Sequence, residues 1–324
     1  MRDLEKEKNL FLELLKDKEI RRQIRQLAKT ARGTKSTREH KSHLKILRPT
    51  GLFASPSDLQ ILRAIFKWKI MPRFLIKSIF RRSESEKTFE KRLERLAKKG
   101  LLQRVDHLGT ARFFQLTAQG FLRFRQGLDG FQEEGFASEN LWHDFLSLAL
   151  QLGLWSAAKP NSVEIVTEQE IRRFYRSEMP YWLPSTELHR SDGFTRFNNS
   201  LGYSIFSFEV EISRKATDRY DPVCQYYQKN TDIDLVVWLI RDSTLMKIIQ
   251  ERILLSADSL DRHAFILLED FKTNFWNAKI LMHQKGSIKF IDLMSERVGL
   301  PIESISEACR DNLTLNFVKI LSSN

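Results

Sequence analysis

The chain has 324 residues, of which 42% are hydrophobic and 29% charged, and its formal net charge is +12. That length is enough for about two average domains, and the composition excludes a disordered or fibrous protein. No stretch approaches the ~20 successive apolar residues that a membrane helix needs, and the charged first residues show no secretory signal.

The two cysteines, Cys224 and Cys309, stand far apart in the sequence. They form no CxxC pair of the kind that binds zinc, and one possible disulfide is no framework, so a structural zinc site is excluded. A reducing compartment is the simplest environment for such a chain, and we therefore expect a cytoplasmic protein.

The charge is divided unevenly along the chain. Residues 1–126 hold 32 Lys and Arg against 13 Asp and Glu, whereas the remainder holds 21 basic and 28 acidic residues. This asymmetry favours nucleic-acid binding by the front and carboxylate chemistry in the back. We expect four segments: a basic helix and arm (1–55), a DNA-binding domain (56–126), a linker (127–140) and an α/β domain (141–324).

The basic helix and arm have two patterns. Residues 3–29 contain no Gly or Pro and carry a drifting apolar stripe, which predicts one helix. Between residues 30 and 50 the apolar periodicity fades and Lys or Arg recurs at near-regular intervals. This stretch is either an arm that lies along phosphates or a solvated linker, and the sequence leaves both open.

Residues 56–126 show the element order of a winged helix-turn-helix. Apolar spacing predicts a helix over residues 59–66 and a second, short one from Pro72 to about residue 80. A Ser-x-x-Glu capping box at residues 83–86 opens a third helix, which Gly100 ends. Two short strands follow, at residues 102–105 and 112–116, joined by a Gly-containing turn.

In such a domain the third helix lies in the major groove of DNA. Residues of this helix are then nearest the base edges, namely Lys87, Thr88, Lys91 and Arg92. We expect Arg95, Lys98 and Arg112 to contact phosphates. The alternative is a winged helix that mediates only protein contacts.

Strands and helices alternate beyond the Gly-rich boundary at residues 127–135. Helices are expected at 141–152, from Thr167, at 243–254 and in the tail at 301–321, and strands at 163–166, 194–197, 203–212, 234–240, 263–268 and 279–282. Such βαβ alternation predicts a partly parallel, mixed sheet with crossover helices. His143, beside Trp142 on the first of these helices, is interpreted as a packing or capping residue.

The strand over residues 203–212 is the most informative feature. Alternation places Ser207, Glu209 and Glu211 on one face. Two carboxylates on one face repel each other, and Asp192, which begins the preceding strand, can converge on them. Three such oxygen ligands suit Mg²⁺ or Mn²⁺. The alternative is an exposed, solvated polar face.

The acidic residues and the residues that follow them resemble the pattern of a known fold. Asp192, then Glu209-x-Glu211, Arg214-Lys215 and a helix with Tyr220, Gln225, Tyr226 and Tyr227 resemble the restriction-endonuclease-like fold, also called PD-(D/E)XK. Within it, the chain is most similar, over about residues 56–270, to the replication-relaxation family, which includes the MOB-C class of plasmid mobilisation relaxases. Those proteins also place a winged helix before the nuclease-like domain.

The resemblance implies roles for the acidic residues. Asp192, Glu209 and Glu211 would bind the metal, Glu168 (Glu170 as second choice) would complete the site, and Lys215 or Arg219 would neutralise the developing phosphorane charge. The common nuclease pattern has Lys where this chain has Glu211. The base that activates the nucleophile is therefore left open, and Lys215 is one candidate.

These observations lead to one main expectation and two alternatives. The main one is a metal-dependent relaxase or nicking endonuclease of a mobile element that cuts one strand of an origin-like double-stranded DNA site, with other mobilisation or replication proteins, or a second copy, as possible partners. The first alternative is a non-enzymatic origin-binding accessory, replication or regulatory protein. A transposon-end endonuclease is disfavoured, because the winged helix follows the nuclease domain in the examples known to us.

Overall fold

The computed structural model of the chain describes residues 55–80, 83–105, 111–125, 135–157, 163–199, 202–282, 286–298 and 307–324. Almost all of the predicted basic helix and arm, the tip of the predicted hairpin and most of the predicted linker lie outside these ranges. The described residues form a mixed α and β structure with eleven α-helices, one three-stranded sheet and one seven-stranded sheet.

The three-stranded sheet belongs to the first part of the described chain. Its elements are α4 (Pro56–Trp68), β1 (Ile70–Pro72), α5 (Arg73–Phe80), α6 (Glu86–Lys98), β2 (Leu102–Val105), β3 (Phe113–Leu116) and α7 (Ala118–Arg125). The strand order is β1-β3-β2, with all pairs antiparallel. The three predicted helices and two predicted strands are confirmed. Strand β1 was not predicted, because three residues are too few to show a period.

The predicted capping box at the start of α6 is wrong by two residues. The N-cap is Ser85, whose side chain accepts a hydrogen bond from the Thr88 amide at 3.2 Å. From this start, Phe89, Leu93 and Leu96 share the buried face of the helix. A true capping box opens α4, where Ser55 and Asp58 satisfy each other's amides.

The seven-stranded sheet has the order β10-β9-β8-β7-β6-β5-β4, in which β6, β7 and β8 are parallel and the other pairs antiparallel. Its strands are β4 (Val163–Thr167), β5 (Gly193–Asn199), β6 (Gly202–Glu211), β7 (Leu235–Ile240), β8 (His263–Leu267), β9 (Lys279–Met282) and β10 (Gly286–Lys289). The accompanying helices are α8 (Leu141–Gln151), α9 (Glu168–Arg173), α10 (Asp221–Lys229), α11 (Ser243–Leu255), α12 (Leu268–Asn274), α13 (Phe290–Val298) and α14 (Glu307–Leu321). The prediction of a mixed, partly parallel sheet is confirmed; β10 and α13 were not predicted.

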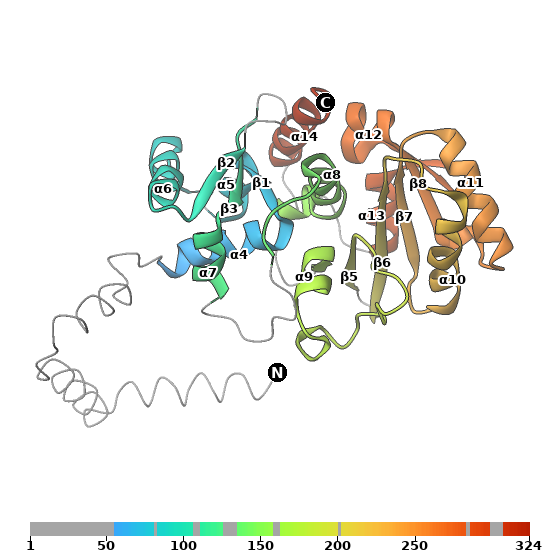
Figure 1. Ribbon diagram of the computed structural model, residues 1–324. Helices are drawn as coiled ribbons and strands as arrows, with labels where there is room; N and C mark the ends of the chain where they lie inside the picture. The colour runs from blue at the N-terminus through green and yellow to red at the C-terminus, as the bar shows by residue number, and fades with distance from the viewer. Residues whose placement is uncertain are drawn as a thin grey trace, which may run out of the picture. The chain divides into compact units, whose positions relative to one another are not determined.

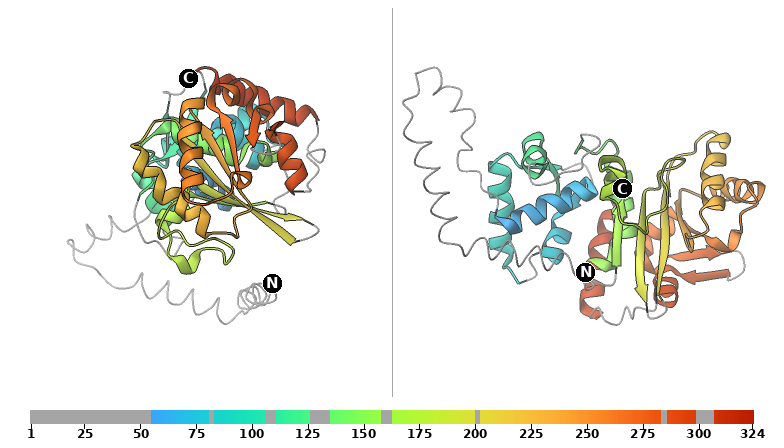
Figure 2. Two further views of the ribbon diagram at one scale, coloured as in Figure 1. Left: turned by 90° about the vertical axis from the view of Figure 1, so that its right-hand side faces the viewer. Right: turned by 90° about the horizontal axis from the view of Figure 1, so that it is seen from below.

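Helices cover both faces of this sheet, as Figures 1 and 2 show, with α8 and α13 on one side of the central strands and α10 and α11 on the other. Strand β7 is buried along its whole length. Its alternate residues enter two separate apolar clusters, Val237 on the α8 side and Trp238 on the α10 side. The polar face of β6 therefore turns toward α10 and α11.

The α8-side cluster continues into the first part of the chain. Phe113 of β3 meets Phe145 of α8 with ring centroids 5.1 Å apart, and Phe74 of α5 meets Phe317 of α14 at the same distance. Residues 54–324 accordingly form one compact unit.

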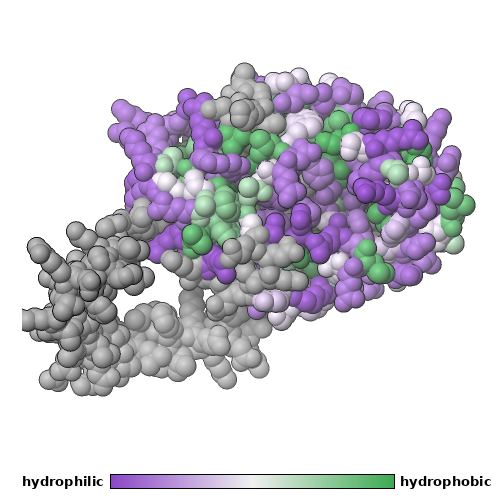
Figure 3. Space-filling model, in the orientation of Figure 1, coloured by the Kyte–Doolittle hydropathy of each residue, from purple (hydrophilic) through white to green (hydrophobic). Residues whose placement is uncertain are grey.

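Within the described ranges, no helix is long and apolar enough to cross a membrane. Figure 3 shows hydrophilic side chains over most of the coloured face, interrupted by separate hydrophobic patches.

Candidate functional site

The pairing of β5 with β6 brings the three predicted acidic residues to one end of the two strands. Gly193 lies opposite Phe208, so Asp192 lies beside Glu209. The Asp192 carboxylate accepts a hydrogen bond of 2.7 Å from the Val210 amide, which stands between Glu209 and Glu211. Register and this single bond therefore fix Asp192 next to both glutamates.

The alternative of an exposed polar face on β6 is wrong. Ser207, Glu209 and Glu211 are 0%, 4% and 5% exposed. Helix α10 and the turn before it cover this face with Tyr220 and Tyr227, which are also buried. A buried carboxylate needs a partner or a proton, so each contact of these acids is informative.

Glu209 has two partners that the sequence did not indicate. His189, from the irregular segment between α9 and β5, lies 2.6 Å from the Glu209 carboxylate through its Nε2 atom. The Tyr227 hydroxyl donates to the same oxygen and also lies 2.8 Å from Ser207 Oγ. Burial opposes a charge on His189, but the negative charges of Glu209 and Asp192 raise its pKa. The Glu209 carboxylate thus favours the charged form of His189.

Glu211 is paired with Lys215, whose ammonium contacts its carboxylate. Burial raises the pKa of Glu211 to about 7; Lys215 opposes this rise, and the charges of Glu209 and Asp192 add to it. This mutual effect shows that the three carboxylates lie within electrostatic range of one another. Arg219 is exposed just before α10 and forms no ion pair with another described residue.

His143 lies in this site and is more than a packing residue. Its Nε2 atom is 3.5 Å from the Asp192 carboxylate and 3.2 Å from the Val210 carbonyl oxygen. Burial alone would lower the pKa of His143, but Asp192 and Asp144 raise it to about 11. The same positive charge offsets the burial of Asp192 and lowers its pKa. Asp192 is consequently held as a carboxylate.

The side chain of Glu168 is linked to Asp192 through a chain of contacts that passes through Lys69, Asp144 and His143. Its carboxylate is 3.1 Å from Lys69 Nζ and 3.4 Å from Arg172. Lys69, which has a positive φ of 61°, also lies 3.0 Å from Asp144. Glu170 caps its own helix through the Thr167 amide. Neither glutamate of α9 joins the acidic residues of β6 directly.

The three acids suit a divalent ion by chemistry, since hard cations prefer carboxylate oxygens. In the described part of the chain, however, no three His, Cys, Asp or Glu side chains are arranged as a set of metal ligands. The reason is visible in the contacts: Glu209 turns toward His189 and Tyr227, while Glu211 turns toward Lys215. A metal at Asp192, Glu209 and Glu211 would have to compete with these partners.

The predicted DNA-contacting residues divide into two groups. Lys87, Thr88, Lys91 and Lys98 are exposed on α6, and Thr88 contributes to its cap. The arginines are engaged with acidic residues: Arg95 with Asp58, Arg112 with Glu90, and Arg92 with both Asp58 and Glu84. Asp58 is almost fully buried, so Arg92 and Arg95 neutralise an internal charge.

Comparison of the chain with protein-family models, with curated proteins and with solved structures gave no match. The functional inference therefore rests on the residues of this chain. His189 and Tyr227 had only weak sequence signals: His189 stands three residues before Asp192, and Tyr227 lies on a predicted helix of the resemblance.

Proposed function

We propose that the chain is a DNA-binding, divalent-metal-dependent nuclease that nicks one strand, as a relaxase or nicking endonuclease does. The observation that supports this most is the convergence of Asp192, Glu209 and Glu211 from two paired strands, with Lys215 beside them. Buried carboxylates that repel one another are costly to a fold, which favours a role in binding a cation.

The arrangement of the helices and strands also supports this proposal. We interpret α4 to α6 with the β1-β3-β2 sheet as a winged helix-turn-helix, and the larger sheet as restriction-endonuclease-like. The exposed lysines of α6 would face DNA. The free thiols of Cys224 and Cys309 agree with action in a reducing cytoplasm.

Each residue of the site has a definite role in this proposal. Asp192, Glu209 and Glu211 would hold Mg²⁺ or Mn²⁺, which would supply an activated water and neutralise phosphate charge. His143 keeps Asp192 ionised, and His189 orients Glu209. Lys215 is placed to offset the charge that develops on the phosphate.

A plasmid assay tests the proposal. The full chain is expected to convert supercoiled plasmid to the open circular form in Mg²⁺ or Mn²⁺ and to leave it unchanged in EDTA. Because a contaminating nuclease would give the same result, Glu209→Ala and the exposed α12 variant Glu269→Ala are purified identically. We expect Glu209→Ala to be inactive and Glu269→Ala to match the wild type. Equal nicking by all three proteins would exclude the site.

One observation favours the non-enzymatic alternative, an origin-binding accessory or regulatory protein. The partners of Glu209 and Glu211 leave no ready set of metal ligands among the described residues. Under this alternative the acids serve the fold only. Wild-type protein that binds DNA but nicks none with either metal would establish it.

The lysines and arginines of α6 are expected to behave differently. Lys87→Ala/Lys91→Ala should weaken DNA binding and reduce its salt dependence without changing the thermal midpoint, because both side chains are exposed. Arg92→Ala should lower the thermal midpoint instead, since the buried Asp58 carboxylate loses one of the two arginines that pair with it. Gel shifts at two salt concentrations and thermal unfolding measure the two effects. Unchanged DNA binding by the double lysine variant would mean that α6 is not the reader.

A further inference from the structure

A small pocket lies beside the acidic site, in the segment between α9 and β5. It has a volume of about 220 Å³ and is lined by apolar side chains and by Arg172, Arg176, Arg190, Ser185, Thr186 and Glu187. Three guanidinium groups and two hydroxyls, with one carboxylate, form a lining suited to a phosphate.

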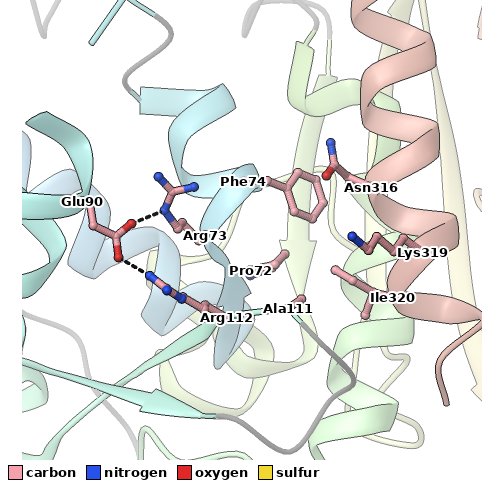
Figure 4. Close-up of a pocket in the computed structure, with 9 residues that line it drawn as sticks. All are labelled: Pro72, Arg73, Phe74, Glu90, Ala111, Arg112, Asn316, Lys319 and Ile320. Atoms are coloured by element: carbon pink, nitrogen blue, oxygen red, sulfur yellow. Dashed lines mark hydrogen bonds and ion pairs between the residues drawn. The ribbon is translucent and has the colours of Figure 1, made fainter. Parts of the chain in front are cut away.

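The charges of this pocket are largely available. Arg176 donates to the Leu183 carbonyl, and neither Arg176 nor Arg190 forms an ion pair with another described residue. Arg172 shares Glu168 with Lys69. In a larger pocket of about 420 Å³ near α14, by contrast, Glu90 pairs with both Arg73 and Arg112, as Figure 4 shows.

The segment between α9 and β5 also contributes residues to the acidic site. Arg190 directly follows His189, which contacts Glu209, and lies two residues before Asp192. Tyr226 packs against His189 with ring centroids 5.3 Å apart. Burial and Glu209 raise the pKa of Tyr226, and the charge of Arg176 opposes that rise. Arg176 therefore lies within electrostatic range of Tyr226. The pocket and the acids are therefore neighbours.

The segment between α9 and β5 also carries exposed aromatic side chains. In the described residues, the large aromatic side chains that are at least half exposed are Tyr175, Tyr181 and Tyr203, at 52%, 84% and 50%. The first two belong to the pocket's own segment. Tyr181 and Tyr203 both lie against the guanidinium of Arg196, at 5.6 and 5.1 Å. Exposed aromatic faces beside basic groups are typical of surfaces on which unpaired bases stack.

We propose that this pocket binds one phosphate of a single-stranded stretch of the nucleic-acid substrate, next to the cleavage site, while bases stack on Tyr175 and Tyr181. The inference rests on the proposed function, since it assigns a place to the strand that enters the acidic site. It favours an unpaired strand, because the faces of exposed tyrosines can contact bases only where these are not stacked within a duplex.

Fluorescence anisotropy with a labelled single-stranded oligonucleotide tests the pocket in EDTA, so that no cleavage is needed. The full-chain variant Arg176→Ala/Arg190→Ala should bind about tenfold more weakly, and the slope of log affinity against log salt should decrease by about 0.7 for one phosphate. The control, Lys279→Ala/Lys289→Ala, removes two exposed cations from a cross-strand pair at the opposite edge of the sheet and should stay within about twofold. Tyr175→Ala/Tyr181→Ala should weaken oligonucleotide binding as well.

The results separate this proposal from the proposed function. Equal binding by wild type and the double arginine variant, or an equal loss in the lysine control, would overturn the pocket even if the wild type nicks plasmid. Pocket-dependent binding by a protein that never nicks would overturn the nuclease and leave the pocket intact. Inorganic phosphate and a mononucleotide, added as competitors, distinguish the sources of the phosphate. If either displaces the strand at micromolar concentration, the pocket takes a free phosphate and the strand assignment is wrong.

Discussion

Glu211→Gln is expected to reduce plasmid nicking by about 10²-fold or more, the usual cost of removing one group that stabilises the charged transition state. The wild-type rate should also depend on pH near neutrality. Burial raises the pKa of Glu211 to about 7, so this residue is a carboxylate only above that pH. Below pH 7 the wild-type rate should fall about tenfold per pH unit, because the protonated acid neither binds a cation nor pairs with Lys215.

The contribution of Glu211 to the free energy of unfolding should change with pH in the opposite direction to the nicking rate. The folded-state pKa of about 7 lies above the ordinary value of 4.5, so the folded chain binds more protons in between. This group therefore stabilises the fold below about pH 4.5, and that contribution is lost as the pH rises through 7. The difference corresponds to about 3 kcal/mol for a group buried as deeply as Glu211.

Nicking at pH 6 and pH 8, and urea unfolding at pH 5 and pH 8, measure the two effects. In Glu211→Gln the corresponding part of the pH dependence of unfolding should disappear, because the amide does not titrate. Glu164→Gln, on the edge strand β4 and partly exposed, is the matched control and should retain both wild-type profiles. If the unfolding free energy changed by the same amount between pH 5 and pH 8 in the wild type and in Glu211→Gln, the assigned pKa would be wrong.

The alternating pattern of β6 was the best guide that the sequence offered to the site. A period of two places Glu209 and Glu211 on one face whatever the fold, and a strand beginning just after Asp192 brings that residue to their end of the sheet. Local sequence therefore sufficed to propose the acids and their common face. It could not show that this face is buried, because burial depends on how α10, the next helix along the chain, packs back over β6.

The contacts of the two histidines of the site could not be predicted from the sequence, for a related reason. His189 lies in a segment without periodicity, where spacing gives no direction for a side chain. His143 stands on a helix whose turn toward Asp192 depends on how α8 crosses β6. The partners of Arg92 depend in the same way on the contact of α6 with Asp58. Counting charges along a helix does not reveal which of them the protein neutralises internally.

Gly120→Ala is expected to destabilise the protein by about 3 kcal/mol, at the upper end of the usual cost of overpacking a core. A Cβ atom at Gly120 would lie 1.9 Å from the Leu101 carbonyl oxygen and 2.8 Å from its carbon. Backbone atoms cannot rotate away, and this carbonyl also accepts the Thr117 amide. Helix α7 would have to move outward, which would separate Phe121 and Phe124 from Phe66.

The sign of this effect distinguishes packing from helix propensity. Within a helix Ala is intrinsically favoured over Gly by about 1 kcal/mol, so an open position 120 would make the variant more stable than the wild type. Urea unfolding of Gly120→Ala, with the exposed neighbour Gln119→Ala as control, decides between the two. A lower midpoint in the first and little change in the second would show that α7 lies directly on the start of β2. A higher midpoint for Gly120→Ala would mean that this close approach, and with it the seating of α7 against α4, is wrong.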